Sequence, residues 1–299
     1  MSRPFRFGVT MMTPTGGEEW RRKCRRAEDL GYDVILVPDH LGLPAPFPAV
    51  VAAAEATERP RVGTFVLNAG FWNPTLLARE VATTDALTGG RLELGLGTGY
   101  VKAEHDAAGL PFGTPGERVT HLRRTVEELD RILTDPELRP PSPQRPRPPY
   151  LIGGHGDRML RLTAAHADIA AFHGTRTDPA DPGGKLIALP AAQVAERVAA
   201  YRRFAAERRS TAAPAELNLL LQMVVPTGDR RAAARTALDR IPYLTEDEIL
   251  DLPILLIGTV AQQAEQLRAQ RERYGFSYIS VLEPAMEALA PVIEELSGS

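Results

Sequence analysis

Asp39 and His40 form a polar pair directly after a short apolar run, and they are the first candidates for proton-transfer chemistry. A histidine side chain titrates near neutral pH, so at a ligand site it can accept or donate a proton. The alternative is structural, with Asp39 capping a helix and His40 buried in the core. The two residue types leave both interpretations open.

A glycine-rich segment, Gly95–Gly99, is the second candidate. It departs from the dinucleotide-binding fingerprint, because Tyr100 and Lys102 stand where a third glycine would be. As a loop it would let a ligand approach the backbone amides, with the Thr98 hydroxyl beside them. Tyr100 could itself donate a proton, or it could shape the pocket.

The third candidate is the segment Gly153–Arg158, which carries three glycines around His155. A glycine-rich turn into a helix N-terminus presents free N–H groups and a partial positive charge, which together favour phosphate. Arg158, and Arg161 one turn further on, would add positive charge. The alternative is a tight turn with a surface arginine.

The segment Thr64–Pro74 is rich in aromatic and small residues, which suits a wall against a flat ring. Core packing explains its aromatic residues equally well. The six histidines lack the spacing and the glutamate partner of a metalloprotease, so we expect no metal site. The single cysteine, Cys24, has no base nearby and is interpreted as a helix residue, not as a nucleophile.

Alternating strands and helices must position these segments. Continuous apolar runs are typical of parallel strands that are covered by helices on both faces. They predict strands at Phe5–Met11, Val34–Val37, Arg61–Leu67, Leu92–Leu96, Tyr150–Gly153, Asp168–His173, Leu217–Val225, Leu255–Gly258 and Tyr278–Val281. Amphipathic stretches predict helices at Glu18–Leu30, Asn73–Leu87, Arg118–Leu133, Gly156–Ala165, Pro190–Arg209, Val260–Tyr274 and Pro284–Leu296, with helical segments in Asp229–Leu252.

This rhythm gives about eight βα units. We therefore predict an α/β fold, a (β/α)₈ TIM barrel with extended loops at its C-terminal mouth, in a single domain over residues 1–299. An open doubly wound sheet is the competing architecture. Pro136–Pro149 is interpreted as a surface connector and Thr175–Leu189 as a long mobile loop. Because functional residues of such barrels lie on the loops that follow the strands, the four segments would meet at one mouth.

The composition disfavours several partners. A net charge of −3 and a pI near 6.1 give no basic field, so we expect no nucleic-acid and no membrane-surface partner. No apolar run approaches the roughly 20 residues of a membrane helix. The N-terminus has no long apolar region behind it, and a lone cysteine fits a reducing compartment. We expect a soluble, cytoplasmic protein.

Taken together, these segments resemble the bacterial luciferase-like superfamily and, within it, the F420-dependent oxidoreductases. The order and spacing of the matching pieces are more specific than any piece alone. They are the opening strand Phe5–Met11, Ala27–Asp33, Pro38-Asp39-His40, Val62-Gly63-Thr64, Asn73–Glu80, Gly89–Gly99, Glu104, Gly109–Phe112 and Ile152-Gly153-Gly154.

The resemblance implies a site for a tricyclic deazaflavin, coenzyme F420, at the barrel mouth. A non-proline cis peptide, at Phe65–Val66 in this sequence, would bulge under the ring. Asp39 and Asn68 would lie near the polar edge of the ring, with Thr98 and Gly99 along its linker. The phosphate would be held by the turn at Gly153, Gly154, His155 and Gly156, and by Arg158. His40 would make the proton transfer that accompanies hydride transfer.

Two departures bear on the substrate. The F420-dependent sugar-phosphate dehydrogenases, which this chain resembles around Asp39-His40, place a tryptophan where this sequence has Pro44 and a glutamate where it has Tyr100. The segments Leu41–Pro48 and Thr175–Leu189, both interpreted as loops, supply mostly apolar residues. We therefore expect reduction of a larger, less charged small molecule or peptide, such as a natural-product alkene or imine. The resemblance also implies a homodimer, formed through helices beside the second to fourth strands.

Three other functions stay open. An FMN-dependent monooxygenase would share the barrel and the phosphate site. A non-catalytic flavin-binding relative would keep the barrel without turnover. An unrelated phosphate-binding barrel such as an aldolase would require a lysine at a strand end, whereas Lys102 and Lys185 are both placed in loops.

Overall fold

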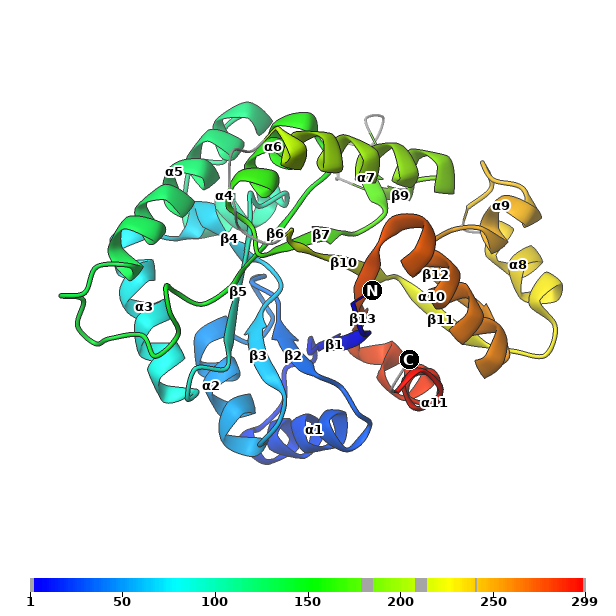
Figure 1. Ribbon diagram of the computed structural model, residues 1–299, viewed down its shortest axis with the longest axis horizontal. Helices are drawn as coiled ribbons and strands as arrows, with labels where there is room; N and C mark the ends of the chain where they lie inside the picture. Colours follow the sequence, from blue (N-terminus) through cyan, green and yellow to red (C-terminus); the bar gives the residue numbers. More distant parts are fainter. Residues whose placement is uncertain (1–2, 179–184, 208–213, 240, 298–299) are drawn as a thin grey trace.

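The computed structural model describes residues 3–178, 185–207, 214–239 and 241–297. Within these residues eight parallel strands pair side by side into a closed ring, because β3 pairs with β5 and β13 pairs with β1 (Figure 1). The predicted (β/α)₈ barrel is thereby confirmed. In ring order the strands are β1 (Arg6–Thr10), β2 (Val34–Val37), β3 (Arg61–Thr64), β5 (Leu92–Gly97), β6 (Tyr150–Gly153), β7 (Ile169–Phe172), β10 (Glu216–Leu221) and β13 (Phe276–Leu282).

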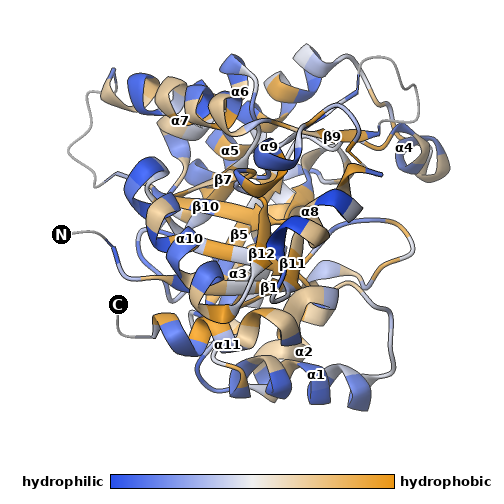
Figure 2. Ribbon diagram, turned by 90° about the vertical axis from the view of Figure 1, so that its right-hand side faces the viewer, coloured by the Kyte–Doolittle hydropathy of each residue, from blue (hydrophilic) through white to orange (hydrophobic). Residues whose placement is uncertain are grey.

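Helices surround the strands (Figure 1), and these helices combine hydrophilic and hydrophobic residues, whereas the barrel strands are mainly hydrophobic (Figure 2). Side chains cap several N-termini, as with Thr114 and Glu117, which form a reciprocal capping box at the start of α5. The outer helices are α1 (Gly17–Asp29), α2 (Pro46–Ala56), α3 (Pro74–Leu87), α5 (Pro115–Leu133), α6 (Asp157–His166), α7 (Ala191–Ala206), α10 (Val260–Tyr274) and α11 (Met286–Leu296). Shorter helices are η1 (Ala69–Phe71), α4 (Lys102–Ala108), α8 (Arg230–Leu238), α9 (Glu246–Leu250) and η2 (Glu283–Ala285).

Helix α2 corrects the sequence analysis, which placed Leu41–Pro48 in a loop. Pro46 occupies the first turn, where a proline ring costs no hydrogen bond. Phe47, Val50 and Ala53 are buried, and the rest of the helix is mainly alanine and valine. Such a helix lacks the polar face that produces an amphipathic pattern, so periodicity could not reveal it.

The strand predicted at Leu255–Gly258 is present as β12, but it is not part of the barrel. Among the described strands it pairs only with β11 (Met223–Pro226), and the predicted strand Leu217–Val225 is divided between β10 and β11. Both edges of β10 are already occupied by β7 and β13, so β12 extends the structure beside the barrel. An apolar run predicts a buried strand but does not say which neighbour it joins.

Two further predictions need adjustment. The loop Thr175–Leu189 contains a short antiparallel pair, β8 (Thr175–Thr177) and β9 (Leu186–Ala188), on either side of residues 179–184, which lie outside the described residues. The strand Arg61–Leu67 is divided between β3 and β4 (Leu67–Asn68), and the Phe65–Val66 peptide between them is cis, as the resemblance implied. The helical segments predicted in Asp229–Leu252 are present as α8 and α9. The C-terminal end of the predicted helix Pro190–Arg209 lies outside the described residues.

An ion-pair network closes the N-terminal end of the barrel. Glu93, only 1% exposed, binds the guanidinium groups of Arg6 at 3.0 Å and Arg61 at 2.8 Å, and Arg6 also reaches Glu216 at 3.5 Å. These residues stand at the starts of strands β1, β3, β5 and β10. Chemistry is therefore confined to the opposite, C-terminal mouth, as expected for this fold.

Between the two ends, side chains fill the barrel. The interior cluster consists of Val34, Leu36, Leu151, Ile169, Ala171 and Tyr278, with Phe65 and Val66 packed against it from the mouth side. Strands β3 and β5 lie so close that a Cβ on Gly95 would come 2.0 Å from the carbonyl oxygen of Thr64. The glycine at this position is thus required by strand packing.

Candidate active site

His40 and Glu104 form a hydrogen-bonded pair at the mouth. His40 follows β2, Glu104 lies in the first turn of α4, and His40 Nδ1 is 2.9 Å from Glu104 Oε1. A carboxylate accepts hydrogen bonds and does not donate them, so Nδ1 carries the proton. Within the described residues His40 Nε2 has no protein partner, and the ring is 31% exposed. The pair can therefore take up or release a proton at Nε2.

Tyr100 lies beside this pair. Its ring meets His40 edge-on, with the ring centroids 5.7 Å apart, and its side chain is 53% exposed. Burial, and then the charge of Glu104, raise the pKa of the Tyr100 phenol, so it keeps its proton at neutral pH. The two residues predicted for proton transfer are thus neighbours.

Sequence reasoning gave no role to Glu104, although it belonged to the resemblance. A usable signal was present: an acidic residue soon after β5 shares the barrel edge on which His40 lies. The sequence did not predict the short helix α4, which directs the Glu104 carboxylate toward His40 in the loop after β2.

Asp39 is a hydrogen-bond acceptor inside the protein. Its Oδ2 accepts from the backbone N–H of Asn68 at 3.1 Å and from Trp72 Nε1 at 3.0 Å. Burial raises the pKa of Asp39 despite these two bonds and the nearby His40. The carboxylate thereby ties the loop after β2 to the segment β4–η1, and it caps no α-helix.

Asn68 points its side chain into the protein. It is 5% exposed, its Oδ1 accepts from the N–H of Gly70 at 3.0 Å, and its Nδ2 donates to His105 Nε2 at 2.9 Å. His105 Nδ1 donates in turn to the carbonyl of Pro111 at 3.0 Å, which fixes its tautomer. The Asn68 amide therefore links β4 to α4 through His105 beneath the barrel mouth and does not point into the mouth.

Gly99 fits against this support. Its φ is +68°, and a Cβ there would lie 2.3 Å from Asn68 Oδ1. Thr98 and Gly99 follow directly after β5, and the partly exposed side chains of Phe65 and Val66 line the neighbouring wall. The structure thus brings the predicted ring and linker residues to one side of the mouth.

The turn between β6 and α6 has the features of an anion site. Gly153 ends β6, and Gly156 is the N-cap of α6 without any side-chain capping bond. Arg158 Nη2 donates to the Thr120 hydroxyl at 2.9 Å, and within the described residues it binds no carboxylate. Asp157 is neutralised by Arg197 at 2.8 Å. Free N–H groups and an available guanidinium are what a phosphate requires.

Arg161, the second predicted cation of this turn, is engaged elsewhere. It forms an ion pair with Glu207 at 3.0 Å and stacks over the ring of Phe204. Arg158 is therefore the cation of this turn that remains available.

The side chain of His155 turns inward, against His173 at the end of β7. The two imidazoles meet edge-on with centroids 4.1 Å apart. Burial lowers the pKa of His173 to about 4 and that of His155 well below its usual value. Both rings are neutral at pH 7, and the backbone N–H of His155 is the group it can offer to an anion. The sequence gave no sign that these two histidines meet.

Cys24 and Lys102 lack the environment of a reactive residue. Cys24 is buried, which raises the pKa of its thiol to about 12. Lys102 was predicted to lie in a loop, but it is the first residue of α4, and its ammonium group binds Asp106 at 2.6 Å. No described helix is long and apolar enough to cross a membrane, and the described residues contain no cluster of metal-binding side chains.

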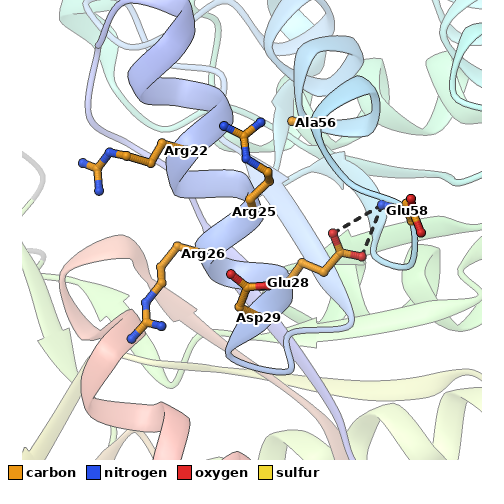
Figure 3. Close-up of a pocket in the computed structure, with 7 residues that line it drawn as sticks. All are labelled: Arg22, Arg25, Arg26, Glu28, Asp29, Ala56 and Glu58. Carbon is orange, nitrogen blue, oxygen red and sulfur yellow. Dashed lines mark hydrogen bonds between the residues drawn. The ribbon is translucent and has the colours of Figure 1, made fainter.

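A surface hollow lies along the C-terminal half of α1, near the loop that leads into β3 (Figure 3). Three of its charged groups already have partners: the Glu28 carboxylate accepts from the backbone N–H groups of Glu58 and Arg59, Arg26 binds Glu287, and Arg22 binds Glu19. The lining residues are Arg22, Arg25, Arg26, Glu28, Asp29, Ala56 and Glu58.

Comparison with known proteins identifies the family of the chain and relatives that share its fold. The sequence profile of the family described as luciferase-like monooxygenase matches residues 1–272. The chain is 38% identical over 121 residues to an F420-dependent glucose-6-phosphate dehydrogenase of Intrasporangium calvum, a match that covers 37% of this chain and 36% of that protein. It is 27% identical over 200 residues to an uncharacterized protein of Mycobacterium tuberculosis, covering 54% and 70%. The match thus spans about a third of the length of the dehydrogenase.

Solved structures share the fold. F420-dependent tetrahydromethanopterin reductase from Methanopyrus kandleri superposes with a TM-score of 0.73 at 17% identity, covering 98% of both chains. A long-chain alkane monooxygenase superposes with a TM-score of 0.77 at 13% identity, covering 99% of this chain and 92% of that one. Likeness at this level of identity concerns the fold alone.

Proposed function

The chain belongs to the luciferase-like monooxygenase family, and on this basis we propose that it is an oxidoreductase that uses coenzyme F420. The observation that carries the proposal is the His40–Glu104 pair, which presents an unbonded imidazole nitrogen at the barrel mouth. A group that moves a proton at this place is what hydride transfer to or from a C–O, C–N or C–C bond requires.

The residues of the mouth fit the cofactor. Phe65 and Val66 offer an apolar wall for the ring, and Thr98 and Gly99 would lie along its linker. The N–H groups after Gly153 and the Arg158 guanidinium would hold the phosphate. Asp39 and Asn68 would hold the loops of the mouth in place without touching the cofactor through their side chains, since those side chains bind other parts of the protein. When bound, F420 supplies two-electron hydride transfer.

Two observations support F420 over FMN. A curated relative, 38% identical over the matched 121 residues, is an F420-dependent dehydrogenase. Arg158, which has no carboxylate partner within the described residues, is suited to the acidic tail that F420 carries and FMN lacks. The FMN-dependent monooxygenase is the second candidate, and the description of the family favours it. A non-catalytic cofactor carrier would have no use for the His40–Glu104 pair.

We propose that the substrate is an apolar organic molecule and that the reaction is a reduction. Leu41 and Tyr100 are exposed by 52% and 53% beside the His40 pair, and Leu186 is 44% exposed in the segment after β7. Pro44 and Tyr100 stand where the sugar-phosphate dehydrogenases have tryptophan and glutamate. A natural-product alkene or imine would suit such a rim better than a phosphorylated sugar.

We also propose a homodimer that buries the outer face of α3. Leu76 and Leu87 on this helix are exposed by 52% and 59%, and α2 beside it is largely apolar. Light scattering should give about twice the 32.6 kDa chain mass. A Leu76→Glu, Leu87→Glu double variant should then give the monomer mass, and a monomeric wild-type protein would refute this point.

The proposed activity is tested by oxidation of reduced F420 in the presence of a panel of apolar enones and imines. The wild-type protein should oxidise the cofactor with at least one of these acceptors. His40→Ala should bind F420 with unchanged affinity but turn over about 100-fold more slowly or worse, since general acid–base catalysis contributes this much. Equal turnover by both proteins would exclude His40 as the proton-transfer group.

A further inference from the structure

The hydrogen bond between His40 and Glu104 joins two elements that are 64 residues apart in the chain. The Glu104 side chain is 16% exposed, so it is largely shielded from water. A charge-assisted hydrogen bond of 2.9 Å in such a place orients the imidazole as well as holding it.

The neighbouring charges leave this carboxylate to His40. Lys102, in the same turn of α4, binds Asp106. His105 is bonded to Asn68 and to the carbonyl of Pro111, and Asp39 accepts from Trp72 and Asn68. Tyr100 keeps its proton, because burial and the charge of Glu104 both raise the pKa of its phenol. Of these groups, Asp39 and Tyr100 interact electrostatically with the pair: the charges of His40 and Glu104 act on the pKa of Asp39, and the charge of Glu104 raises that of Tyr100.

We propose that Glu104 is the positioning residue of this site: it holds His40 in the Nδ1–H tautomer and thereby makes Nε2 the atom that exchanges a proton with substrate. An imidazole without such a partner can carry its proton on either nitrogen, and one of the two forms has no free lone pair at the mouth. The catalytic part of this inference rests on the proposed function, whereas the tautomer does not.

The proton balance follows from the tautomer. In the reducing direction the imidazolium Nε2–H bond would break and its proton would go to the substrate atom that becomes O–H, N–H or C–H; reduced F420, when bound, would supply the hydride to the neighbouring carbon. In the reverse direction the lone pair of Nε2 takes that proton back. Glu104 keeps its charge throughout and stabilises the imidazolium, as the aspartate of a Ser-His-Asp triad does.

The tautomer is measured on the protein without cofactor or substrate, by ¹⁵N NMR of histidine-labelled material. His40→Gln identifies the His40 signals. In the wild-type protein we expect a protonated Nδ1 and an unprotonated Nε2 at a pH where the ring is neutral. In Glu104→Gln we expect this preference to be lost, because the amide can either accept from or donate to Nδ1.

The matched control is Asp106→Asn, which makes the same change of charge two residues further along α4. Asp106 binds Lys102 and has no bond to His40, so the His40 signals should not move. Glu104→Asp, which keeps a carboxylate, should retain part of the wild-type tautomer preference even if the glutamine variant is less stable.

The kinetic readout separates positioning from binding. With an accepted substrate, Glu104→Gln should lower kcat about 10- to 1,000-fold, with KM and F420 affinity changed less than about threefold. Asp106→Asn should keep wild-type kcat. A wild-type His40 protonated on Nε2, or a tautomer unchanged in Glu104→Gln, would overturn the inference. Failure of the wild-type protein to bind F420 would refute the proposed function and leave the tautomer result standing.

Discussion

The carboxylate of Asp39 accepts a hydrogen bond from the indole N–H of Trp72 at 3.0 Å, and with it the loop after β2 is fastened to the segment after β4. The same oxygen accepts from the backbone N–H of Asn68. His40, the next residue, is thereby held over the barrel mouth. The position of His40, the proposed proton-transfer group, thus depends on a neighbour whose carboxylate is bonded inside the protein.

Removal of this acceptor should destabilise the protein. Asp39→Ala leaves two N–H groups without a partner and should lower the free energy of unfolding by about 1–3 kcal/mol, measured by urea denaturation. Asp39→Asn keeps an acceptor oxygen and should cost less. An alanine variant as stable as the wild-type protein would show that the bond to Trp72 does not hold the loop.

Gly99 and Gly109 offer a matched pair for the support behind the mouth. Their φ values are +68° and +67°, but a Cβ on Gly99 would strike Asn68, whereas nothing lies within 4 Å of one on Gly109. Gly109→Ala should cost only the strain of a left-handed residue, about 1–2 kcal/mol. Gly99→Ala should cost more and should also weaken F420 binding, which thermal melts and fluorescence titration would measure. Equal effects of the two variants would mean that Asn68 can move aside.

Arg158 and Arg161 offer a second pair. Arg158 has no carboxylate partner within the described residues, and Arg161 binds Glu207. Arg158→Ala should weaken F420 binding about 10- to 100-fold, the amount expected for a lost bond to a charged group. The effect should shrink as salt is added, because screening weakens the same attraction in the wild-type protein. Arg161→Ala should leave the affinity for F420 unchanged. An equal loss of affinity in both variants would show that Arg158 is not the residue that binds the phosphate.

The buried pair His155 and His173 should make stability depend on pH. Burial lowers the pKa of both rings, that of His173 to about 4, so below pH 6.5 the unfolded chain binds more protons than the folded protein. Stability is then full above pH 6.5 and falls as the pH drops from 6.5 toward 4. Urea denaturation at pH 5 and pH 7 should show this loss, and His173→Gln should reduce it. A variant with the wild-type pH dependence would mean that His173 is not the group responsible.

Much of the barrel could be predicted from the sequence, because its strands are continuous apolar runs and its amphipathic helices show one polar face. The exceptions have physical causes. Helix α2 is apolar all round, so its sequence has no helical period, and β12 has the composition of a barrel strand but finds no free edge there. Periodicity reports burial, not the identity of the neighbour.

The candidate site followed a similar rule. His40, Tyr100 and the turn before Arg158 could be found because they follow predicted strands. Glu104 and the contact of His155 with His173 depend on how separate loops fold toward one another. Asn68 was expected near the polar edge of the ring, but its side chain is bonded to His105 and to the N–H of Gly70. Side-chain direction within a loop is set by tertiary contacts that no local pattern encodes.

The central claim, that this barrel binds F420 and uses it in preference to FMN, is tested most directly by titrating the purified protein with each cofactor and following fluorescence. Our account predicts saturable F420 binding at least about tenfold tighter than FMN binding, the difference arising from the bonds that Arg158 makes with the acidic tail, since both cofactors carry the phosphate. Tighter binding of FMN, or binding of neither cofactor, would contradict it.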